Sequence, residues 1–329
     1  MKKFIFKTSI LFLLVSISCL PVLYFNIVID PYGIFRTKFL EQKIEPNQHF
    51  IKIKFLTNNT IKKDSFIFGS SRVGKIKIKD NPKLKNYYNM TYSEGVPKEH
   101  LDDIKTLLNN GLNIKNIIIG LDNISYLISP DLHTSQALRM AYTPNNYLEI
   151  VSAYIKYSLL KPSIEIYREI NKQRDFKVFY DIYNTGVPEV IGKDEWIEKN
   201  TIAHINAKKF EIPAWETYYN PRIETTIKEI SEIKDICQKN NISLIFFINP
   251  MHKVTYHRQN FNDWFTFLSK LSEITDFYNF SGINKITTNN YYYYETSHYR
   301  PIVGDMIIKR ILGNEINKEN DNDDFGAFI

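Results

Sequence analysis

A serine turn and a distant glutamate–histidine pair are the most reactive patterns in this chain. Ser71 lies in a Gly-Ser-Ser-Arg segment at 69–72, directly after the apolar run Phe-Ile-Phe at 66–68. Far downstream, Glu295 and His298 belong to the segment Glu-Thr-Ser-His. A serine is a poor nucleophile unless a base removes its proton, and that base needs a third group to orient it. Ser71, His298 and Glu295 could supply these roles, because a three-residue spacing on a helical turn puts Glu295 and His298 on one side.

Each pattern also has a simpler interpretation. Gly-Ser-Ser-Arg is a common turn sequence, and an isolated histidine is more often a surface or structural residue. Glu-x-x-His also serves as a metal-binding pair in helix bundles, but the sequence contains no matching second pair. We therefore expect neither a metal nor another cofactor. It is the combination of the two patterns that favours nucleophilic catalysis.

Strands and helices alternate over most of the chain, which indicates a parallel sheet with helices on both faces. Apolar runs predict strands at 64–69, 87–91, 114–121, 242–248 and 275–280. Helical spacing of apolar residues predicts helices at 97–110, 223–240, 261–271 and 302–312. The predicted fold is α/β, in a flavodoxin-like three-layer α/β/α arrangement with a mostly parallel sheet. Loops that follow such strands gather at one edge, where residues distant in sequence can meet.

The remaining segments complete the predicted domain plan. The α/β domain spans 64–312 and contains an insertion at about 125–215, where the alternation is lost. Amphipathic pieces at 148–160 and 163–171 lie in this insertion, which could form a cap or a partner surface. A polar lead-in at 30–63 precedes the domain. Residues 313–329 are rich in Asn, Asp and Glu, and we expect a disordered acidic tail there.

The N-terminal segment is apolar and carries no charge from Thr8 to Ile29. At 1.5 Å per residue it would reach roughly 33 Å, enough to cross a bilayer core. Lysines precede it and no charge follows until Asp30, so the positive-inside rule places residues 1–7 in the cytoplasm and the rest outside. We predict a single-pass anchor at 8–29 in a bacterial cytoplasmic (inner) membrane, with an extracytoplasmic domain.

Two other N-terminal signals were considered. A cleaved signal peptide would have a shorter apolar core and an Ala-x-Ala-like site, which the sequence lacks. A lipoprotein signal at Cys19 would have a leucine three residues earlier, where Ser16 stands. The second cysteine, Cys237, lies in a predicted helix and cannot plausibly pair with Cys19.

Composition narrows the class of protein further. The 329 residues suffice for one large domain, and 42 basic against 36 acidic residues leave a mild net charge of +6. No basic stripe with interleaved aromatic residues stands out, which argues against nucleic acid as a partner. Aromatic residues make up 14% of the chain, which is compatible with a tyrosine-lined groove for sugars.

Taken in this order, the motifs resemble those of the SGNH (GDSL-like) hydrolase superfamily over about 64–312. The sequence looks most similar to a membrane-anchored envelope branch that includes alginate O-acetyltransferase-like proteins and the D-alanine transfer protein of teichoic acid synthesis. Ser71 stands at the serine of the family's Gly-Asp-Ser, with Ser70 replacing the aspartate. Glu295 and His298 stand at its Asp-x-x-His. The resemblance implies that Ser71 is the nucleophile, His298 the base and Glu295 the carboxylate that orients it.

The resemblance also implies two segments that hold the oxyanion of the reaction. In the first, the glycine whose backbone N–H donates corresponds to Glu94 or Gly95. In the second, the family's Gly-x-Asn-Asp reads Gly-Leu-Asp-Asn, so that Asp122 occupies the position of the donor amide. A carboxylate cannot donate to an oxyanion. Either Asn123 turns in, or Arg72 supplies positive charge, or the hole is weaker, and Asp122 could instead cap its own loop.

Three other histidines were weighed. His252 follows the strand at 242–248 and could approach the site or substrate, or serve a structural or surface role. His133 and His257 offer no spacing argument.

Two classes of function follow from these patterns. In the first, the chain is an extracytoplasmic serine esterase or O-acyltransferase that moves an acyl group, acetyl above all, on an envelope polysaccharide, with a polytopic membrane acyltransferase as partner. The sequence does not separate hydrolysis from transfer, because that depends on whether water or a sugar hydroxyl reaches the acyl-enzyme. In the second, the chain is an inactive scaffold or glycan-binding subunit that keeps the fold.

Overall fold

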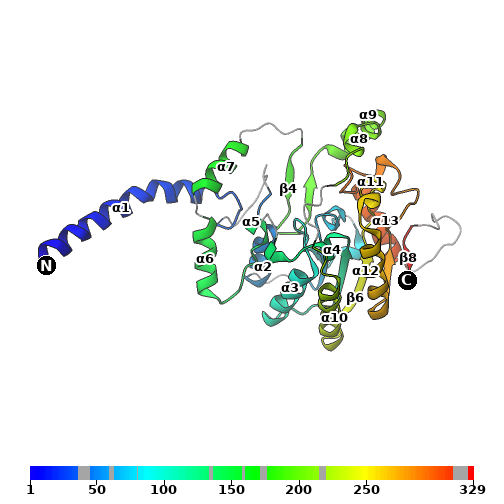
Figure 1. The fold of residues 1–329 in the computed structure, drawn as a ribbon, viewed down its shortest axis with the longest axis horizontal. Helices are drawn as coiled ribbons and strands as arrows, with labels where there is room; N and C mark the ends of the chain where they lie inside the picture. Colours follow the sequence, from blue (N-terminus) through cyan, green and yellow to red (C-terminus); the bar gives the residue numbers. More distant parts are fainter. Residues whose placement is uncertain are drawn as a thin grey trace.

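The computed structural model describes residues 1–35, 45–58, 63–79, 81–132, 136–157, 160–170, 176–214, 220–313 and 325–329. These residues form an α/β domain around one mostly parallel sheet, and a long N-terminal helix projects from it (Figure 1). The main sheet consists of β1 (Ser65–Gly69), β2 (Tyr87–Asn89), β3 (Asn116–Leu121), β6 (Ser243–Ile248), β7 (Phe277–Asn279) and β8 (Ala327–Phe328). The longer helices are α1 (Lys2–Ile29), α2 (Gln48–Asn58), α3 (Pro97–Asn109), α6 (Tyr147–Tyr157), α7 (Leu160–Ile170), α10 (Ile223–Lys239), α12 (Phe261–Ile274) and α13 (Pro301–Leu312).

The sheet has the strand order β2-β1-β3-β6-β7-β8. All of its pairings are parallel except the last, in which β8 runs antiparallel to β7. The register places Gly69, the last residue of β1, opposite Gly120 in β3. The loops after β1 and β3 therefore leave the sheet side by side, at its C-terminal edge.

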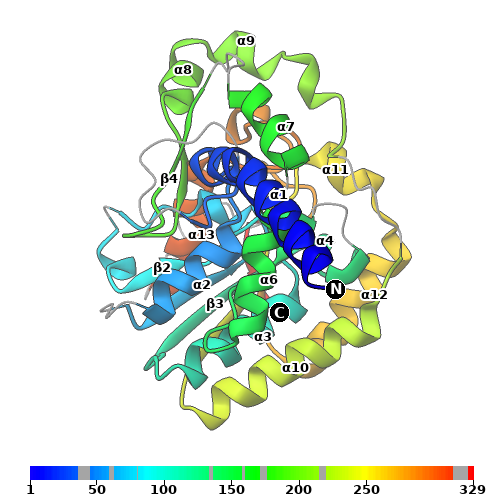
Figure 2. The same ribbon diagram turned by 90° about the vertical axis from the view of Figure 1, so that its left-hand side faces the viewer.

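Apolar side chains pack on both faces of the sheet, because successive residues of a strand point to opposite sides. Phe66 and Phe68 of β1 join one buried cluster, which also takes in side chains of α3, α10 and α12. Ile67 points the other way into a second cluster, whose helical part comes from α13. Figure 2 shows α3 and α10 running close together across the first of these faces.

Most of the elements expected from periodicity are present with nearly the expected bounds. The strands β1, β2, β3, β6 and β7 and the helices α3, α10, α12 and α13 all fall within the predicted ranges or within a few residues of them. The predicted amphipathic pieces of the insertion correspond to α6 and α7. The α/β class and the mostly parallel sheet are confirmed.

The insertion contains more regular structure than periodicity indicated. A separate antiparallel pair, β4 (Val178–Tyr180) with β5 (Pro188–Val190), crosses it. Short helices also occur, namely α4 (Ile124–Leu127), α5 (Gln136–Arg139), α8 (Lys193–Lys199) and α9 (Thr201–Ile205). Segments of three to seven residues carry too little periodicity to be recognised in sequence.

Two other predictions differ from the structure. The lead-in at 30–63 contains the helix α2, whose buried residues include His49 and Lys52 as well as apolar ones. These polar residues hide the helical spacing of the buried face. At the end of the chain, the prediction of a disordered tail is wrong for the last residues, because β8 extends the sheet there and Phe328 contacts the ring of Tyr278. The acidic residues at 314–324 lie outside the described residues.

The N-terminal helix α1 is long and apolar enough to cross a membrane, by length and composition. A signal sequence near an N-terminus would pass the same test. Most of its side chains are exposed, and it ends at Asp30, which adopts a left-handed conformation with φ 35°. The turn that follows is tied to the domain by a hydrogen bond from the Asn47 N–H to the Tyr32 carbonyl at 2.9 Å.

Two phenylalanines of α12 provide a matched test of the core. Phe267 is fully buried and Phe265, two residues earlier, is 57% exposed. We expect Phe267→Ala to lower the free energy of unfolding by about 3–5 kcal/mol, because a large buried side chain leaves a cavity. Phe265→Ala should change it by less than about 1 kcal/mol. Urea unfolding of the full chain in detergent, followed by fluorescence, measures both, and equal losses would contradict this packing.

Candidate active site

The sequence-predicted residues meet where β1 and β3 lie next to each other. From β1 the chain passes first to β2, on one side of β1, and then to β3, on the other side. The strand order therefore reverses next to β1. In open α/β sheets such a reversal leaves a crevice outside the carboxyl ends of the strands, where ligands bind. Ser71 follows β1, and Asp122 and Asn123 follow β3.

Two glycines allow this close approach. Gly69 has a φ of +147°, and a Cβ there would come within 2.7 Å of the Gly120 carbonyl oxygen and of Val73 Cγ1. A Cβ on Gly120 would lie only 2.4 Å from the same Val73 atom. With neither Cβ present, the chain turns sharply after β1 into a 3-10 turn at Val73–Lys75. This turn presents Ser71 at the edge of the sheet.

Ser71, His298 and Glu295 form one hydrogen-bonded chain. Ser71 Oγ lies 2.8 Å from His298 Nε2, and His298 Nδ1 lies 2.5 Å from Glu295 Oε1. Ser71 is partly exposed, and the side chains of His298 and Glu295 are 29% and 35% exposed. A substrate can therefore reach the serine while the imidazole is held between it and a carboxylate. This is the arrangement of an activated serine nucleophile.

Glu295 is held as a carboxylate by its surroundings. Its oxygens also accept hydrogen bonds from the backbone N–H of Ser297 at 2.6 Å and of His298 at 3.2 Å. Burial by itself would raise the pKa of Glu295, but the hydrogen bond and charge of His298, the Ser297 N–H and the charge of Lys193 together lower it to about 2. An ionised Glu295 can accept the Nδ1–H of His298, which leaves Nε2 free to take a proton from Ser71.

Ser70 occupies a different environment from its neighbour. Ser70 is 2% exposed and its hydroxyl donates to Asp122 Oδ2 at 2.7 Å. Its carbonyl accepts a hydrogen bond from the Thr91 hydroxyl at 2.8 Å. Of the two adjacent serines, Ser71 is the one that contacts the histidine and the solvent-accessible side of the site.

Asp122 is the partner of a buried cation. Its Oδ2 lies 2.8 Å from Nη1 of Arg72, and both side chains are only 1% exposed. The Arg72 guanidinium also donates to the Ser297 carbonyl at 3.0 Å and to Asn123 Oδ1 at 3.2 Å. Arg72 thus joins the loop after β1, the loop after β3 and the segment that carries His298.

These contacts show how the second predicted oxyanion segment is held in this structure. The Asp122 carboxylate accepts hydrogen bonds from Ser70, Arg72 and the Ile124 N–H, so it braces its loop and donates to nothing. Asn123 is fully buried, and its side-chain oxygen accepts from Arg72 and caps α4. The positive charge of Arg72 is paired with the carboxylate of Asp122. The three side chains form a support beneath the serine turn.

Gly95 lies close to the serine turn. A Cβ there would come within 3.0 Å of the Gly69 carbonyl oxygen and 2.8 Å of His100 Cε1. Glu94 before it adopts a left-handed conformation with φ 52°. Within the part of the chain that the structure describes, the backbone N–H groups of Ser71 and Gly95 make no hydrogen bond. Ser71 is partly exposed, whereas Gly95 is buried beside the serine turn.

Residues that sequence analysis did not single out hold the Gly95 loop in place. The buried Lys52 of α2 donates to the Thr91 carbonyl at 2.5 Å, and Arg139 of α5 donates to the Ser93 carbonyl at 2.5 Å. Arg139 also forms a buried ion pair with Glu99, which accepts the Val96 N–H at the start of α3. No local pattern in the sequence marks these contacts, because they join segments distant in the chain.

Among the described residues, His252 and His257 make no hydrogen bond with Ser71, His298 or Glu295. His252 is fully buried, accepts the Val254 N–H as the cap of α11 (Lys253–Arg258) and lies 2.9 Å from Asn290 Oδ1. Its role is structural. His257 is exposed on α11. His133 lies outside the described residues.

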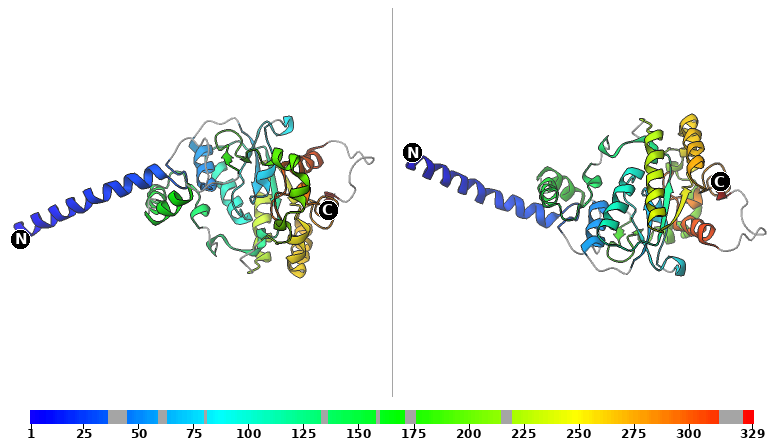
Figure 3. Two further views of the ribbon diagram at one scale, coloured as in Figure 1. Left: turned by 90° about the horizontal axis from the view of Figure 1, so that it is seen from above. Right: turned by 90° about the horizontal axis from the view of Figure 1, so that it is seen from below.

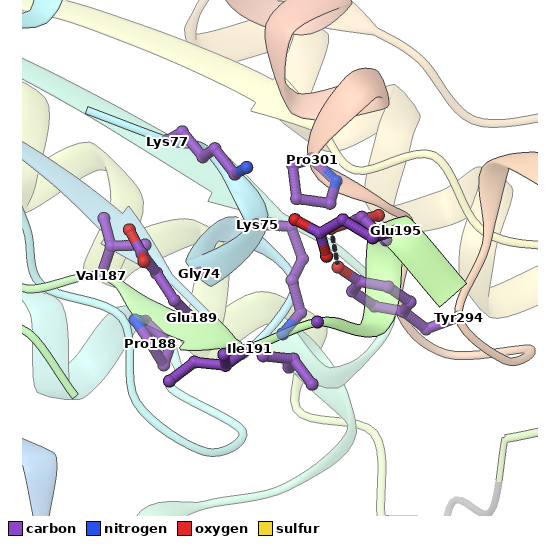
Figure 4. Close-up of a pocket in the computed structure, with 13 residues that line it drawn as sticks. Gly74, Lys75, Lys77, Val187, Pro188, Glu189, Ile191, Glu195, Tyr294 and Pro301 are labelled. Carbon is purple, nitrogen blue, oxygen red and sulfur yellow. Dashed lines mark hydrogen bonds between the residues drawn. The ribbon is translucent and has the colours of Figure 1, made fainter. Parts of the chain in front are cut away.

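A pocket of about 200 Å³ is lined by neighbours in sequence of Ser71 and Glu295, although Ser71, His298 and Glu295 do not line it themselves. Gly74 and Lys75 from the serine turn, Tyr294 next to Glu295, and β5 line it (Figure 4). The Tyr294 ring has Lys193 Nζ 4.3 Å from its centroid and Lys75 Nζ 5.5 Å from it. Burial and the charge of Lys193 lower the pKa of Lys75 to about 8. The acidic Glu189, Asp194 and Glu195 also line the pocket.

The described ranges contain no group of three His, Cys, Asp or Glu residues placed to hold a metal ion. His298 is hydrogen-bonded to Glu295 through Nδ1 and to Ser71 through Nε2. Comparison with known proteins adds no family: no protein-family model matches the sequence, and no curated protein matches it. The chemistry must therefore be argued from the geometry of the site.

Arg72 and Asp122 give a test of the support beneath the serine turn. Arg72→Met removes the cation and leaves the Asp122 carboxylate buried without it, so we expect the free energy of unfolding to fall by about 3–5 kcal/mol. The double variant Arg72→Met/Asp122→Asn removes the stranded charge and should recover part of this loss. Urea unfolding of the three proteins measures the effect. An Arg72→Met variant as stable as the parent would rule out this ion pair as a support.

The lowered pKa of Glu295 predicts a pH dependence of stability. A carboxyl with a lower pKa in the folded than in the unfolded state stabilises the fold above its unfolded pKa and loses this effect as pH falls through the folded pKa. The parent should thus be more stable than Glu295→Gln above about pH 4.5, and the difference should shrink from there towards about pH 2. Unfolding measured across this range tests it, with the exposed Glu211→Gln as control. A difference that grows on acidification would contradict the assignment.

Proposed function

We propose that this protein is an extracytoplasmic serine esterase or O-acyltransferase that acts on an envelope polysaccharide through an acyl-enzyme. The observation that carries the proposal is the contact of 2.8 Å between Ser71 Oγ and His298 Nε2, with His298 Nδ1 bound to Glu295. A partly exposed serine paired with an oriented imidazole at the edge of an α/β sheet has the parts that acyl transfer requires.

In the first half of the reaction, Ser71 Oγ attacks the acyl carbonyl carbon and its proton passes to His298 Nε2. The carbonyl π electrons move to oxygen and form the oxyanion. When the oxyanion collapses, the bond to the leaving alkoxide breaks, and His298 returns the proton to that oxygen. Glu295 holds the imidazole in the required tautomer and stabilises its positive form. The products are the alcohol and an ester of Ser71.

In the second half, another hydroxyl replaces the departed alcohol. His298 removes its proton as its oxygen attacks the acyl-Ser71 carbonyl, and the proton then goes to Ser71 Oγ when the ester bond breaks. Water as the nucleophile releases a carboxylic acid, so the reaction is hydrolysis. A sugar hydroxyl yields a new ester, so the reaction is transfer. The resemblance to envelope acyltransferases favours transfer of an acetyl group.

The oxyanion is assigned to backbone donors. The N–H groups of Ser71 and Gly95 carry no hydrogen bond in the described chain and belong to loops that touch at the Gly69 carbonyl. Hydrogen-bond donors that are already in place where negative charge develops in the transition state lower the activation barrier, because the protein does not have to reorganise during the reaction. Asp122, which stands at the family's amide position, supports the serine turn from below instead.

The fold is consistent with the same proposal. Counting only the parallel strands of the main sheet, the order is 2-1-3-4-5, which is that of flavodoxin-like folds. Buried clusters on both faces support the three-layer arrangement. We propose that residues 64–312 form an SGNH-like domain of this kind, with its site at the switch between β1 and β3.

We further propose that α1 is an uncleaved anchor. Its segment 8–29 would cross a bacterial cytoplasmic membrane, with residues 1–7 in the cytoplasm and the α/β domain outside it. An acyl group destined for an extracytoplasmic glycan must be delivered across that membrane. A polytopic membrane acyltransferase is therefore the partner that we propose to supply it.

A fluorophosphonate probe and a chromogenic acetyl ester test the nucleophile. The parent chain should be labelled at Ser71, as located by mass spectrometry, and should hydrolyse p-nitrophenyl acetate. Ser71→Ala and His298→Gln should each lower the hydrolysis rate by about 10³-fold or more, because nucleophile and base act as one unit. Circular dichroism should show that both variants keep the fold.

Ser70→Ala is the matched control for the neighbouring hydroxyl. Because Ser70 is buried against Asp122, this variant should still be labelled at Ser71. Labelling and hydrolysis that persist in Ser71→Ala would remove Ser71 as the nucleophile and point to Ser70. A parent chain that binds envelope glycan but is neither labelled nor active would instead support the inactive, glycan-binding alternative.

A further inference from the structure

The helices α6 and α7 lie where α1 joins the domain. Figure 1 shows both helices at the C-terminal end of α1, on the side of the domain that faces the N-terminus, and the two views of Figure 3 agree. Phe25 of α1 packs edge-on against Tyr167 of α7, with ring centroids 5.9 Å apart. These helices therefore stand at the level of the last turns of α1.

The helix α6 has an inner face that is bound to the domain. Tyr154 stacks on Phe35, in the turn after α1, with ring centroids 5.0 Å apart. The Tyr154 hydroxyl accepts a hydrogen bond from Lys54 Nζ of α2 at 3.2 Å. This face ties α6 both to the exit of α1 and to the α/β domain.

The outward face of α6 is apolar and exposed. It carries three large side chains, namely Leu148, Val151 and Ile155. Their exposed fractions are 84%, 47% and 64%. A spacing of three and then four residues places them in one stripe along the helix. Leu160, at the start of α7, is 42% exposed as well. A helix face turned to water is ordinarily polar, so this stripe points to an apolar environment.

The position of the stripe indicates which environment that is. Figures 1 and 3 show α6 running across the axis of α1 rather than along it. If α1 crosses a bilayer, α6 therefore lies along the bilayer surface. Phe25 is four residues before the end of α1 at Ile29, which is roughly 6 Å along the helix. Helices that lie in the membrane interface bury their apolar faces by about 5–10 Å, so the depth of α7, which Phe25 contacts, fits an interfacial position.

We propose that α6 and the start of α7 form a lipid-contact surface that lies in the interface of the same bilayer that α1 crosses. Leu148, Val151 and Ile155 insert between lipid acyl chains at the extracytoplasmic side. This inference rests on the anchoring proposed for α1. Together the anchor and the surface hold the domain in one orientation, so that the site faces a constant direction relative to the membrane.

Fluorescence from single labelled cysteines in the full chain tests the surface. The protein is reconstituted in vesicles of phosphatidylcholine and phosphatidylglycerol, with Cys19→Ser removing the exposed native thiol. Cys237 stays, because it is buried and burial raises the pKa of its thiol to about 12. An environment-sensitive fluorophore is attached at Leu148→Cys, at Leu14→Cys in α1, and at Ile202→Cys in α9, which is 77% exposed and lies away from α1 in Figure 1.

At position 148 we expect blue-shifted emission and quenching by spin-labelled lipid several-fold stronger than at position 202. Position 14 should be quenched best by a deep spin label, and position 202 should behave as in water. Aqueous behaviour at 148 with quenching at 14 would overturn the lipid-contact surface and leave the anchor intact. Aqueous behaviour at both would overturn the anchor as well. Protection at 148 in native membranes but not in lipid vesicles would show that a protein covers the stripe.

Discussion

The ion pair between Arg72 and Asp122 is the interaction on which the proposed site depends. Both side chains are almost fully buried, and the guanidinium also binds the carbonyl of Ser297, next to His298. A buried ion pair contributes little net stability, because desolvation of two charges offsets most of their attraction. What these contacts supply is geometry, since Arg72 joins the loop of Ser71 to the loop of Asp122 and to the segment that carries His298.

The sheet sets the frame for that pair. Parallel strands bring the ends of β1 and β3 to one edge, and Gly69 and Gly120 let the two ends approach closely. The Gly95 loop is held from outside this alternation, by Lys52 of α2 and Arg139 of α5. The lead-in and the insertion therefore supply residues that hold the loop of Gly95, which we propose as the second oxyanion donor.

Periodicity predicted the central strands and long helices because their buried faces repeat at regular intervals. It failed for α2, whose buried residues include Lys52 and His49, and for short elements such as β4 and β5. It failed also for β8, because pairing with β7 outweighs the polar composition of the residues before it. In each case tertiary contacts, rather than local preference, stabilise the element.

The sequence by itself determined the strand-and-helix alternation, the apolar segment at 8–29, and the types and order of Ser71, Glu295 and His298. The resemblance already implied Ser71 rather than Ser70, and the tertiary structure adds their different surroundings, with the Ser70 hydroxyl buried against Asp122 and the Ser71 hydroxyl on His298. It also made Asp122 a support rather than an oxyanion donor, and brought Lys75 and Lys193 to the ring of Tyr294. Such pairings join loops that are distant in the chain, and no local pattern of residues encodes which of them will meet at the edge of a sheet.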